Sequence, residues 1–103
     1  MKIVRSHNRV SIRLTEERWQ HIVRRHPEMA TSQESILETI SQPAQIQEGD
    51  YGTLMAIRFY AKTPLTSKYL IAVYREVQPD DGFVLTAYWA SRLSNRRNVL
   101  WKS

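Results

Sequence analysis

Alternating apolar and polar residues predict β-structure at both ends of the chain. Two short alternating stretches, residues 3–5 and 10–14, flank Ser6-His7-Asn8-Arg9 and predict an N-terminal β-hairpin. In the second half, three β-branched and aromatic runs have the length of strands, at residues 54–61, 69–76 and 83–90. Turn-forming residues bound these runs at 49–52, 62–67 and 79–82, which predicts an antiparallel meander. Shorter runs at 44–48 and 98–101 fit one further strand each.

Two helices are predicted between the hairpin and the meander. Thr15 is expected to cap a helix over residues 16–26, which stops at Pro27 because a residue before proline avoids the helical region. The second helix starts at a capping-box sequence, Thr31-Ser32-Gln33-Glu34, and ends before Pro43. Each helix has about three turns, so its stability depends on packing against a larger surface.

The order of these elements predicts the fold class. We expect an α+β domain over residues 1–103, with two short helices packed on one face of a twisted antiparallel sheet of about four strands, preceded by a β-hairpin. A chain of 103 residues, 42% of them apolar, suffices for one such core. No repeat or linker divides it.

Composition excludes several classes of site. The sequence contains no cysteine, which excludes disulfides, thiolate metal sites and cysteine nucleophiles and is compatible with a reducing compartment such as the cytoplasm. No apolar run approaches the roughly 20 residues of a membrane span, and no signal-like segment opens the chain, so no membrane partner is expected.

The charge favours a polyanionic partner. Lysine and arginine number 15 against 10 acidic residues, a formal net charge of +5, and 11 of the 15 are arginine. The planar guanidinium matches phosphate geometry, so a small arginine-rich domain is typical of nucleic-acid binding, although solubility alone also accounts for such a charge.

The parity of the strands predicts a polar face. Met55, Ile57 and Phe59 are expected beneath the helices, and the exposed face would carry the residues of opposite parity: Arg58, Tyr60, Thr86 and Tyr88, joined by Lys68. Phenol rings stack on bases and guanidinium groups bind phosphates, so this strip suits a nucleic acid. A polar outer face is also ordinary in antiparallel sheets. The loop that follows adds Arg92, Arg96 and Arg97.

Two histidines are candidates for acid–base chemistry. At about 100° per residue, His26 falls on the apolar stripe of the first helix with Trp19, where it is either a core residue or a partly buried base oriented by a carboxylate. His21 falls on the polar face, where an ordinary solvated role is the simpler interpretation. Their i, i+5 spacing does not fit a metal pair, and no phosphate-binding glycine loop or Gly-x-Ser-x-Gly elbow is present.

The chain resembles a known nuclease superfamily over residues 14–101. The resemblance lies in Thr15-Glu16-Glu17-Arg18-Trp19-Gln20-His21-Ile22, in Arg25-His26-Pro27-Glu28, in the second helix and in Val84-Leu85-Thr86-Ala87-Tyr88. These residues resemble the small phage and mobile-element domains of the barnase–EndoU–colicin–RelE-like superfamily. Many of its members are metal-independent ribonuclease toxins with one or two helices before a curved four-stranded sheet.

The resemblance implies an endoribonuclease that cleaves RNA by attack of the ribose 2′-hydroxyl on the adjacent phosphodiester. His26 would be the base or the acid, Tyr88 or Thr86 would position the phosphate or donate a proton, and Arg58, Arg92 and Arg97 would hold the developing negative charge. Substrate contacts would come from Tyr60, Lys68, Arg96, Arg97 and His21, the last also a reserve for His26. It implies no metal or cofactor, an RNA substrate (tRNA, mRNA or rRNA) and a cognate antitoxin or immunity protein.

The nuclease hypothesis makes two geometric demands. The cleft of the superfamily lies on the sheet face away from the helices, whereas His26 belongs to the stripe facing the sheet, so the helix end must curl past the sheet edge. The arginine and tyrosine side chains must also share one exposed surface. The alternatives are a non-catalytic RNA- or DNA-binding module on the same fold and a protein-interaction domain.

Overall fold

The computed structural model describes residues 1–61 and 68–103. Along the chain, the elements are β1 (Lys2–Arg5), β2 (Ser11–Leu14), α1 (Glu16–Arg25), a 3₁₀ turn η1 (Pro27–Thr31), α2 (Gln33–Ser41), β3 (Gln45–Glu48), a 3₁₀ turn η2 (Asp50–Gly52), β4 (Leu54–Phe59), β5 (Tyr69–Gln78), β6 (Asp81–Ala90) and β7 (Val99–Lys102). The hairpin, both helices and the five later strands lie close to the predicted ranges. The predicted turn over 62–67 lies outside the described residues.

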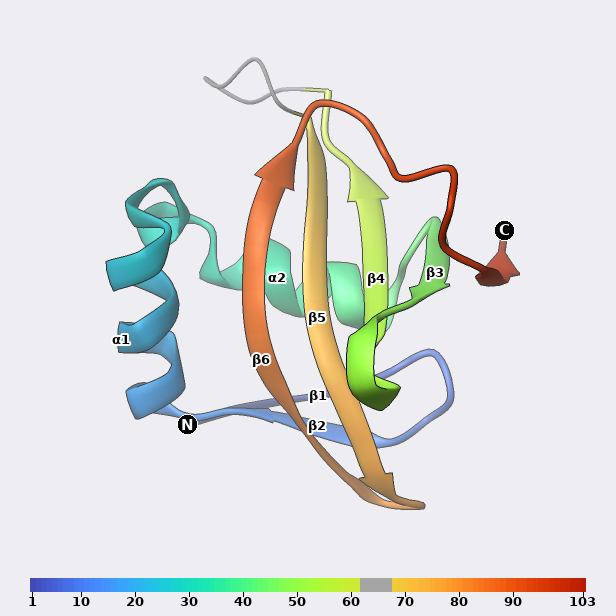
Figure 1. Ribbon diagram of the computed structural model, residues 1–103. Coiled ribbons are helices and arrows are strands. Elements are labelled where there is room, and N and C mark those ends of the chain that lie inside the picture. Colours follow the sequence, from blue (N-terminus) through green and yellow to red (C-terminus); the bar gives the residue numbers. More distant parts are fainter. Residues whose placement is uncertain (62–67) are drawn as a thin grey trace.

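The expected α+β class is confirmed, but the expected sheet of about four antiparallel strands is wrong. Within the described residues, one seven-stranded sheet has the order β1-β2-β6-β5-β4-β3-β7, and β2 runs parallel to β6 (Figure 1). The sheet is larger because the hairpin joins β6 at one edge and β7 joins β3 at the other. Both pairings connect segments far apart in the sequence, so no local pattern signals them.

The parallel contact depends on a glycine. Ile12 pairs with Gly82 at the start of β6, and a Cβ at Gly82 would lie 2.3 Å from the Arg75 carbonyl oxygen and 2.6 Å from Ile12 Cδ1. Only a residue without a side chain allows three strands to approach this closely. Nearby, Ser6 donates a hydrogen bond to Glu76, which ties the hairpin to β5.

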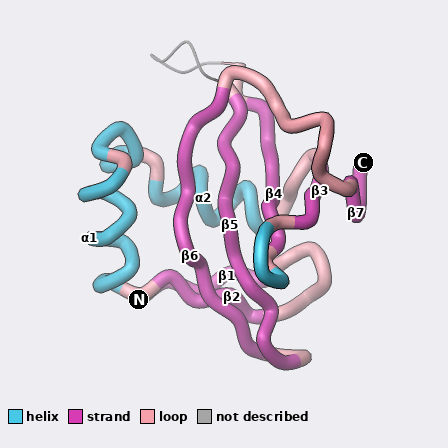
Figure 2. The backbone as a smooth tube through the Cα atoms, in the orientation of Figure 1, coloured by secondary structure: helices cyan, strands magenta, loops and turns pink. Residues whose placement is uncertain are grey.

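The main core lies between the sheet and the helices. α2 crosses behind the sheet and packs on β4 and β5, whereas α1 stands beside β6 (Figures 1 and 2). Ala56, Ala72 and Ala87 are paired across β4, β5 and β6 and are fully buried in this core. Their small side chains leave room for Ile36 and Ile40 of α2, which are also fully buried.

The two helix starts differ from each other. Thr15 caps α1 as predicted, because its Oγ1 accepts a hydrogen bond from the Arg18 amide at 3.1 Å. The capping box predicted at residues 31–34 is wrong: Thr31 belongs to η1, and Ser32, the residue before α2, forms no side-chain cap hydrogen bond. The preceding 3₁₀ turn leads directly into α2, so Ser32 does not have the extended backbone that a capping side chain requires.

The predicted faces of β4 are reversed. Met55 and Ile57 form a second apolar cluster with Ile71 on the face away from α2, with Tyr88 and Leu93 packed against it. The helices therefore cover the residues of the other parity, and the outer face is partly covered by the segment after β6. The strand carries apolar side chains on both faces, so its parity alone could not identify the helix side.

Candidate functional site

A cavity of about 460 Å³ lies between α1 and the outer face of β6. It gathers guanidinium, imidazole, phenol and hydroxyl groups from two elements. The lining residues are Arg18, His21, Arg25, His26, Leu85, Thr86 and Tyr88. This is the candidate site, and it unites four of the sequence-predicted residues: His21, His26, Thr86 and Tyr88.

Helix α1 contributes three of these side chains from one face. Arg18, His21 and Arg25 stand at i, i+3 and i+7, the spacing of neighbours along a helix. Arg18 Nη1 donates to the Leu85 carbonyl oxygen at 3.5 Å, a long hydrogen bond that links the helix to β6. The face that looks solvated in the sequence thus lines the cavity.

His26 reaches the same cavity because the helix ends there. Its backbone has φ −136° and ψ 77°, its amide donates to Ile22 at 2.8 Å, and its carbonyl accepts from Met29 at 2.9 Å. The ring lies 5.9 Å from the Tyr88 ring, centroid to centroid, tilted by 33°. The end of α1 therefore brings His26 close to Tyr88 of β6. His26 Nδ1 lies 3.8 Å from the Glu28 carboxylate, which makes an ion pair when the imidazole is protonated.

Strand β6 supplies Thr86 and Tyr88 from its outer face. They pair with Val73 and Ile71 of β5, whereas Val84, before them, is buried in the main core. A bulge at Leu85 lies between Val84, which faces the core, and Thr86, which faces outward, because Val73 pairs with Thr86 and the next residue, Tyr74, pairs with Val84. Such a bulge re-aims side chains, and it places two polar groups of β6 toward α1.

The protonation states of two groups follow from their surroundings. Burial and then the charges of Arg18, Arg25 and Arg24 lower the pKa of His21 below 6.5, which favours a neutral imidazole at pH 7. Burial raises the pKa of Tyr88 above 10, with Arg97 opposing and Asp50 reinforcing this effect. Its phenol is therefore a hydrogen-bond donor at neutral pH.

A second cavity of about 290 Å³ adjoins the first. Leu85, Thr86 and Tyr88 line both, so the two form one groove across β6. Residues from η2, β4, β5 and the last loop complete the second cavity: Asp50, Tyr51, Thr53, Met55, Val73 and Arg97. Of the predicted loop arginines, Arg97 lies here, in an ion pair with Asp50 at 3.1 Å. Arg92 and Arg96 are exposed and line neither cavity.

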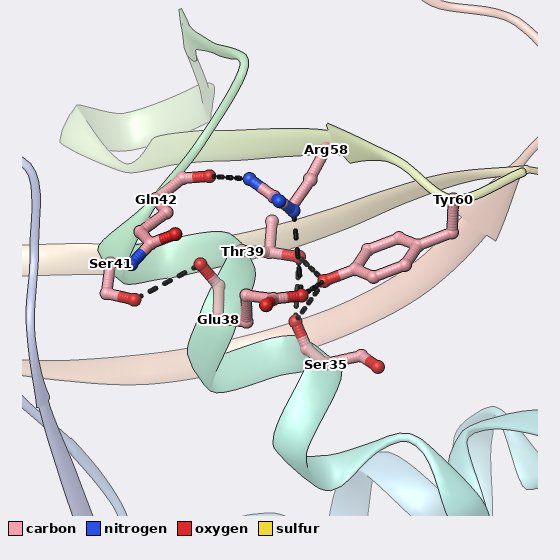
Figure 3. Close-up of polar contacts among 7 residues, drawn as sticks. All are labelled: Ser35, Glu38, Thr39, Ser41, Gln42, Arg58 and Tyr60. Atoms are coloured by element: carbon pink, nitrogen blue, oxygen red, sulfur yellow. Dashed lines mark hydrogen bonds and ion pairs between the residues drawn. The ribbon is translucent and has the colours of Figure 1, made fainter.

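The predicted strip of four residues on one face is wrong, because Arg58 and Tyr60 lie on the helix side (Figure 3). The expectation that the arginine and tyrosine side chains share one exposed surface therefore fails for these two residues. Arg58 Nη1 donates to the Gln42 carbonyl at 2.6 Å, and its Nε lies 3.5 Å from Glu38 Oε1. The Tyr60 hydroxyl donates to the same carboxylate at 2.6 Å. Beyond Phe59 the chain keeps the β4 alternation, so residues of opposite parity to Met55 turn toward α2. Both side chains join β4 to α2.

Lys68 also lies outside the groove. Its Nζ donates to the Ala61 carbonyl at 3.0 Å, beside the start of β5, and it lines neither cavity.

The sequence interpretation missed Arg18 and Arg25 as site residues. Their spacing with His21 was a usable signal, since three basic or imidazole groups share one helix face.

Within residues 1–61 and 68–103, no three His, Asp or Glu side chains cluster as a metal site would require, and no helix is long and apolar enough to cross a membrane. Comparison with protein-family models, curated proteins and solved structures finds no match.

Proposed function

We propose that this protein is an endoribonuclease that cleaves RNA by transesterification and requires no metal ion. The observation that carries the proposal is the gathering of two imidazoles, two guanidinium groups and a phenol in one open cavity of about 460 Å³. The resemblance to the barnase–EndoU–colicin–RelE-like superfamily points to the same chemistry.

The two histidines divide the proton transfers. Neutral His21 takes the proton of the ribose 2′-hydroxyl as its oxygen bonds to phosphorus. His26, whose Nδ1 lies 3.8 Å from the Glu28 carboxylate, acts as the acid and gives a proton to the 5′-oxygen as the bond between phosphorus and that oxygen breaks. The products are a 2′,3′-cyclic phosphate and a free 5′-hydroxyl, and the two histidines end with exchanged protonation states.

The cationic groups stabilise the charge on phosphorus. Arg18 and Arg25 lie on the same helix face as His21, and the Arg18 contact with the Leu85 carbonyl places its guanidinium across the cavity. The attacked phosphate gains negative charge in the transition state, which fixed cations stabilise more than they stabilise the substrate. The Tyr88 phenol donates a further hydrogen bond to a phosphate oxygen.

The biological setting is part of the same proposal. The substrate in this proposal is tRNA, mRNA or rRNA, and the compartment is the cytoplasm, where these RNAs occur. An unregulated ribonuclease damages its own cell, so the proposal includes a toxin role with a cognate antitoxin or immunity protein.

The test is cleavage of purified tRNA, rRNA and mRNA by the purified protein in EDTA. We expect fragments that end in 2′,3′-cyclic phosphate, and none with the double variant His21→Ala/His26→Ala. Intact RNA throughout would overturn the nuclease proposal. RNA that is bound with steep salt dependence but not cut would instead identify the non-catalytic binding module, and no RNA binding would favour the protein-interaction alternative.

A further inference from the structure

The second cavity has the character of a site for a flat, partly polar ring. Met55, Val73 and Leu85 line it with apolar side chains, and its volume of about 290 Å³ is ample for one nucleoside. Asp50 and Tyr51 are the exposed residues of its lining and are called its rim. Because it shares Thr86 and Tyr88 with the first cavity, a group bound here lies next to a phosphate bound there.

Tyr51 is held at the rim in an unusual backbone conformation. Its φ of 56° lies in the left-handed region, which a tyrosine rarely adopts, and the following Gly52 also has positive φ. Arg75 donates a hydrogen bond to the Tyr51 carbonyl. The residue is 92% exposed, although a large aromatic residue is ordinarily buried. Strain of this kind persists where the surroundings enforce it and is concentrated at functional sites.

The loop that carries Tyr51 is tightly built. The Gly49 amide donates to the Thr53 carbonyl at 2.9 Å, and Thr53 Oγ1 donates to the Asp50 carbonyl at 2.7 Å. A Cβ at Gly49 would lie 2.2 Å from Thr53 Oγ1, so the turn closes only with glycine there. The exposed ring is therefore presented from a fixed backbone, which reduces the entropy lost when a ligand stacks on it.

A fixed pair of hydrogen-bonding groups lies beside the ring. Arg97 Nη1 and Nη2 donate to the two Asp50 carboxylate oxygens at 3.1 and 3.4 Å, and Nη1 also donates to the Glu48 carbonyl at 3.2 Å. Each carboxylate oxygen keeps a lone pair after this contact. The pair thus offers oriented acceptors to the N–H groups of a base edge.

We infer that the second cavity is the subsite for the nucleobase adjoining the cleaved phosphate, and that it sets which base is cut. The inference rests on the proposed function. The base stacks on Tyr51, and Asp50, held by Arg97, accepts hydrogen bonds from its edge. Discrimination among bases follows because a base edge with N–H groups matches these acceptor oxygens, whereas an edge that presents carbonyl oxygens is repelled by the carboxylate.

The first experiment measures cleavage of a single-stranded RNA of random sequence, with the cut positions read by sequencing. Loss of one stacked base weakens binding by about 5- to 150-fold, so Tyr51→Ala should lower kcat/KM within that range and flatten the base preference. Tyr51→Phe keeps the ring and should retain both. The control is Phe59→Ala, which removes an aromatic ring that is 52% exposed but lines neither cavity. Unchanged rate and preference in Tyr51→Ala would overturn the inference.

The second experiment separates failure of the subsite from failure of the nuclease proposal. The four nucleoside 3′-monophosphates are titrated into wild-type protein and into the Tyr51→Ala and Asp50→Asn variants, with binding followed by calorimetry. We expect one nucleotide to bind better than the others, and both variants to weaken it. Such binding without RNA cleavage would support the base subsite and contradict the nuclease proposal. If all four nucleotides bind equally well and Tyr51→Ala has no effect on their binding, the subsite inference is wrong, whether or not RNA is cleaved.

Discussion

His26 is held by its backbone hydrogen bonds, and it lines the first cavity. Amide and carbonyl are both engaged, by Ile22 and Met29, where α1 passes into η1. Within the described residues, the His26 ring lies close to the Tyr88 ring and to the Glu28 carboxylate. The sequence allowed either a core or a catalytic histidine at this position. The ring lies outside the main core because the helix ends at this residue, which a helical wheel that continues through residue 26 cannot show.

The first prediction concerns this residue. His26→Ala should lower the RNA cleavage rate by about 10²- to 10⁴-fold, the usual contribution of a general acid or base, while RNA affinity changes little. The matched control is His7→Ala, because His7 stacks on Trp101 with ring centroids 4.0 Å apart and lines neither cavity. Equal activity of the two variants would exclude a catalytic role for His26.

The second prediction concerns the titration of His21. Its pKa is lowered below 6.5, so the imidazole takes up its proton at a lower pH in the folded protein than in the unfolded chain, and kcat/KM should fall as the pH drops through this lowered pKa. Stability follows the same direction, because the unfolded chain takes up the proton first and is favoured as the pH falls. NMR titration of the imidazole should give a midpoint below 6.5, moving up toward it in Arg18→Gln. A midpoint above 6.5 in the wild-type protein would contradict this account.

At the scale of the elements, the sequence patterns predicted the positions of the helices and strands. The capping box of the second helix and the faces of β4 were predicted wrongly. Thr15 before two glutamates is a cap because the chain there is extended; Ser32 has an equally good sequence, but η1 precedes it. The faces of β4 and β6 were less predictable. β4 buries both faces, and the bulge at Leu85 interrupts the alternation of β6, so strict parity fails on each for a different physical reason.

The third prediction compares the two helix starts. Thr15→Ala should lower the free energy of unfolding by about 1 kcal/mol, because the Arg18 amide loses its acceptor. Ser32→Ala should change it by less than about 0.5 kcal/mol, since that side chain forms no cap hydrogen bond. Urea unfolding followed by tryptophan fluorescence measures both. A larger loss at Ser32 than at Thr15 would mean that α2 relies on a cap in solution.

At the scale of the whole molecule, the net charge alone does not show which surface binds a polyanion. It is +5, but the arginines are dispersed: Arg58 binds α2, Arg97 binds Asp50, and Arg18 and Arg25 line the first cavity. Which guanidinium groups meet on one surface depends on the order of strands in the sheet. That order rests on contacts between distant segments, which a single sequence does not reveal.

The fourth prediction uses the salt dependence of RNA binding to find the phosphate path. In the His26→Ala background, Arg18→Gln and Arg25→Gln should each reduce the slope of log affinity against log salt by about 1, as expected when one phosphate contact is lost. Arg5→Gln is the control, because Arg5 lies on the hairpin and donates to the Arg9 carbonyl. A larger effect at Arg5 would move the RNA path to the hairpin.

The pairing of the hairpin with the meander has a consequence for how the protein is made. Ser6 and Glu76, which are 70 positions apart, meet across this junction, and β6 completes both the junction and the groove. A ribosome-bound chain that has emerged only as far as β5 carries His21 and His26 but lacks β6, the strand that lines the other side of the first cavity. Assembly of the groove therefore waits for one of the longest loop closures in the chain, a slow step in folding. Catalytic competence should appear abruptly, when β6 docks, and not build up during synthesis.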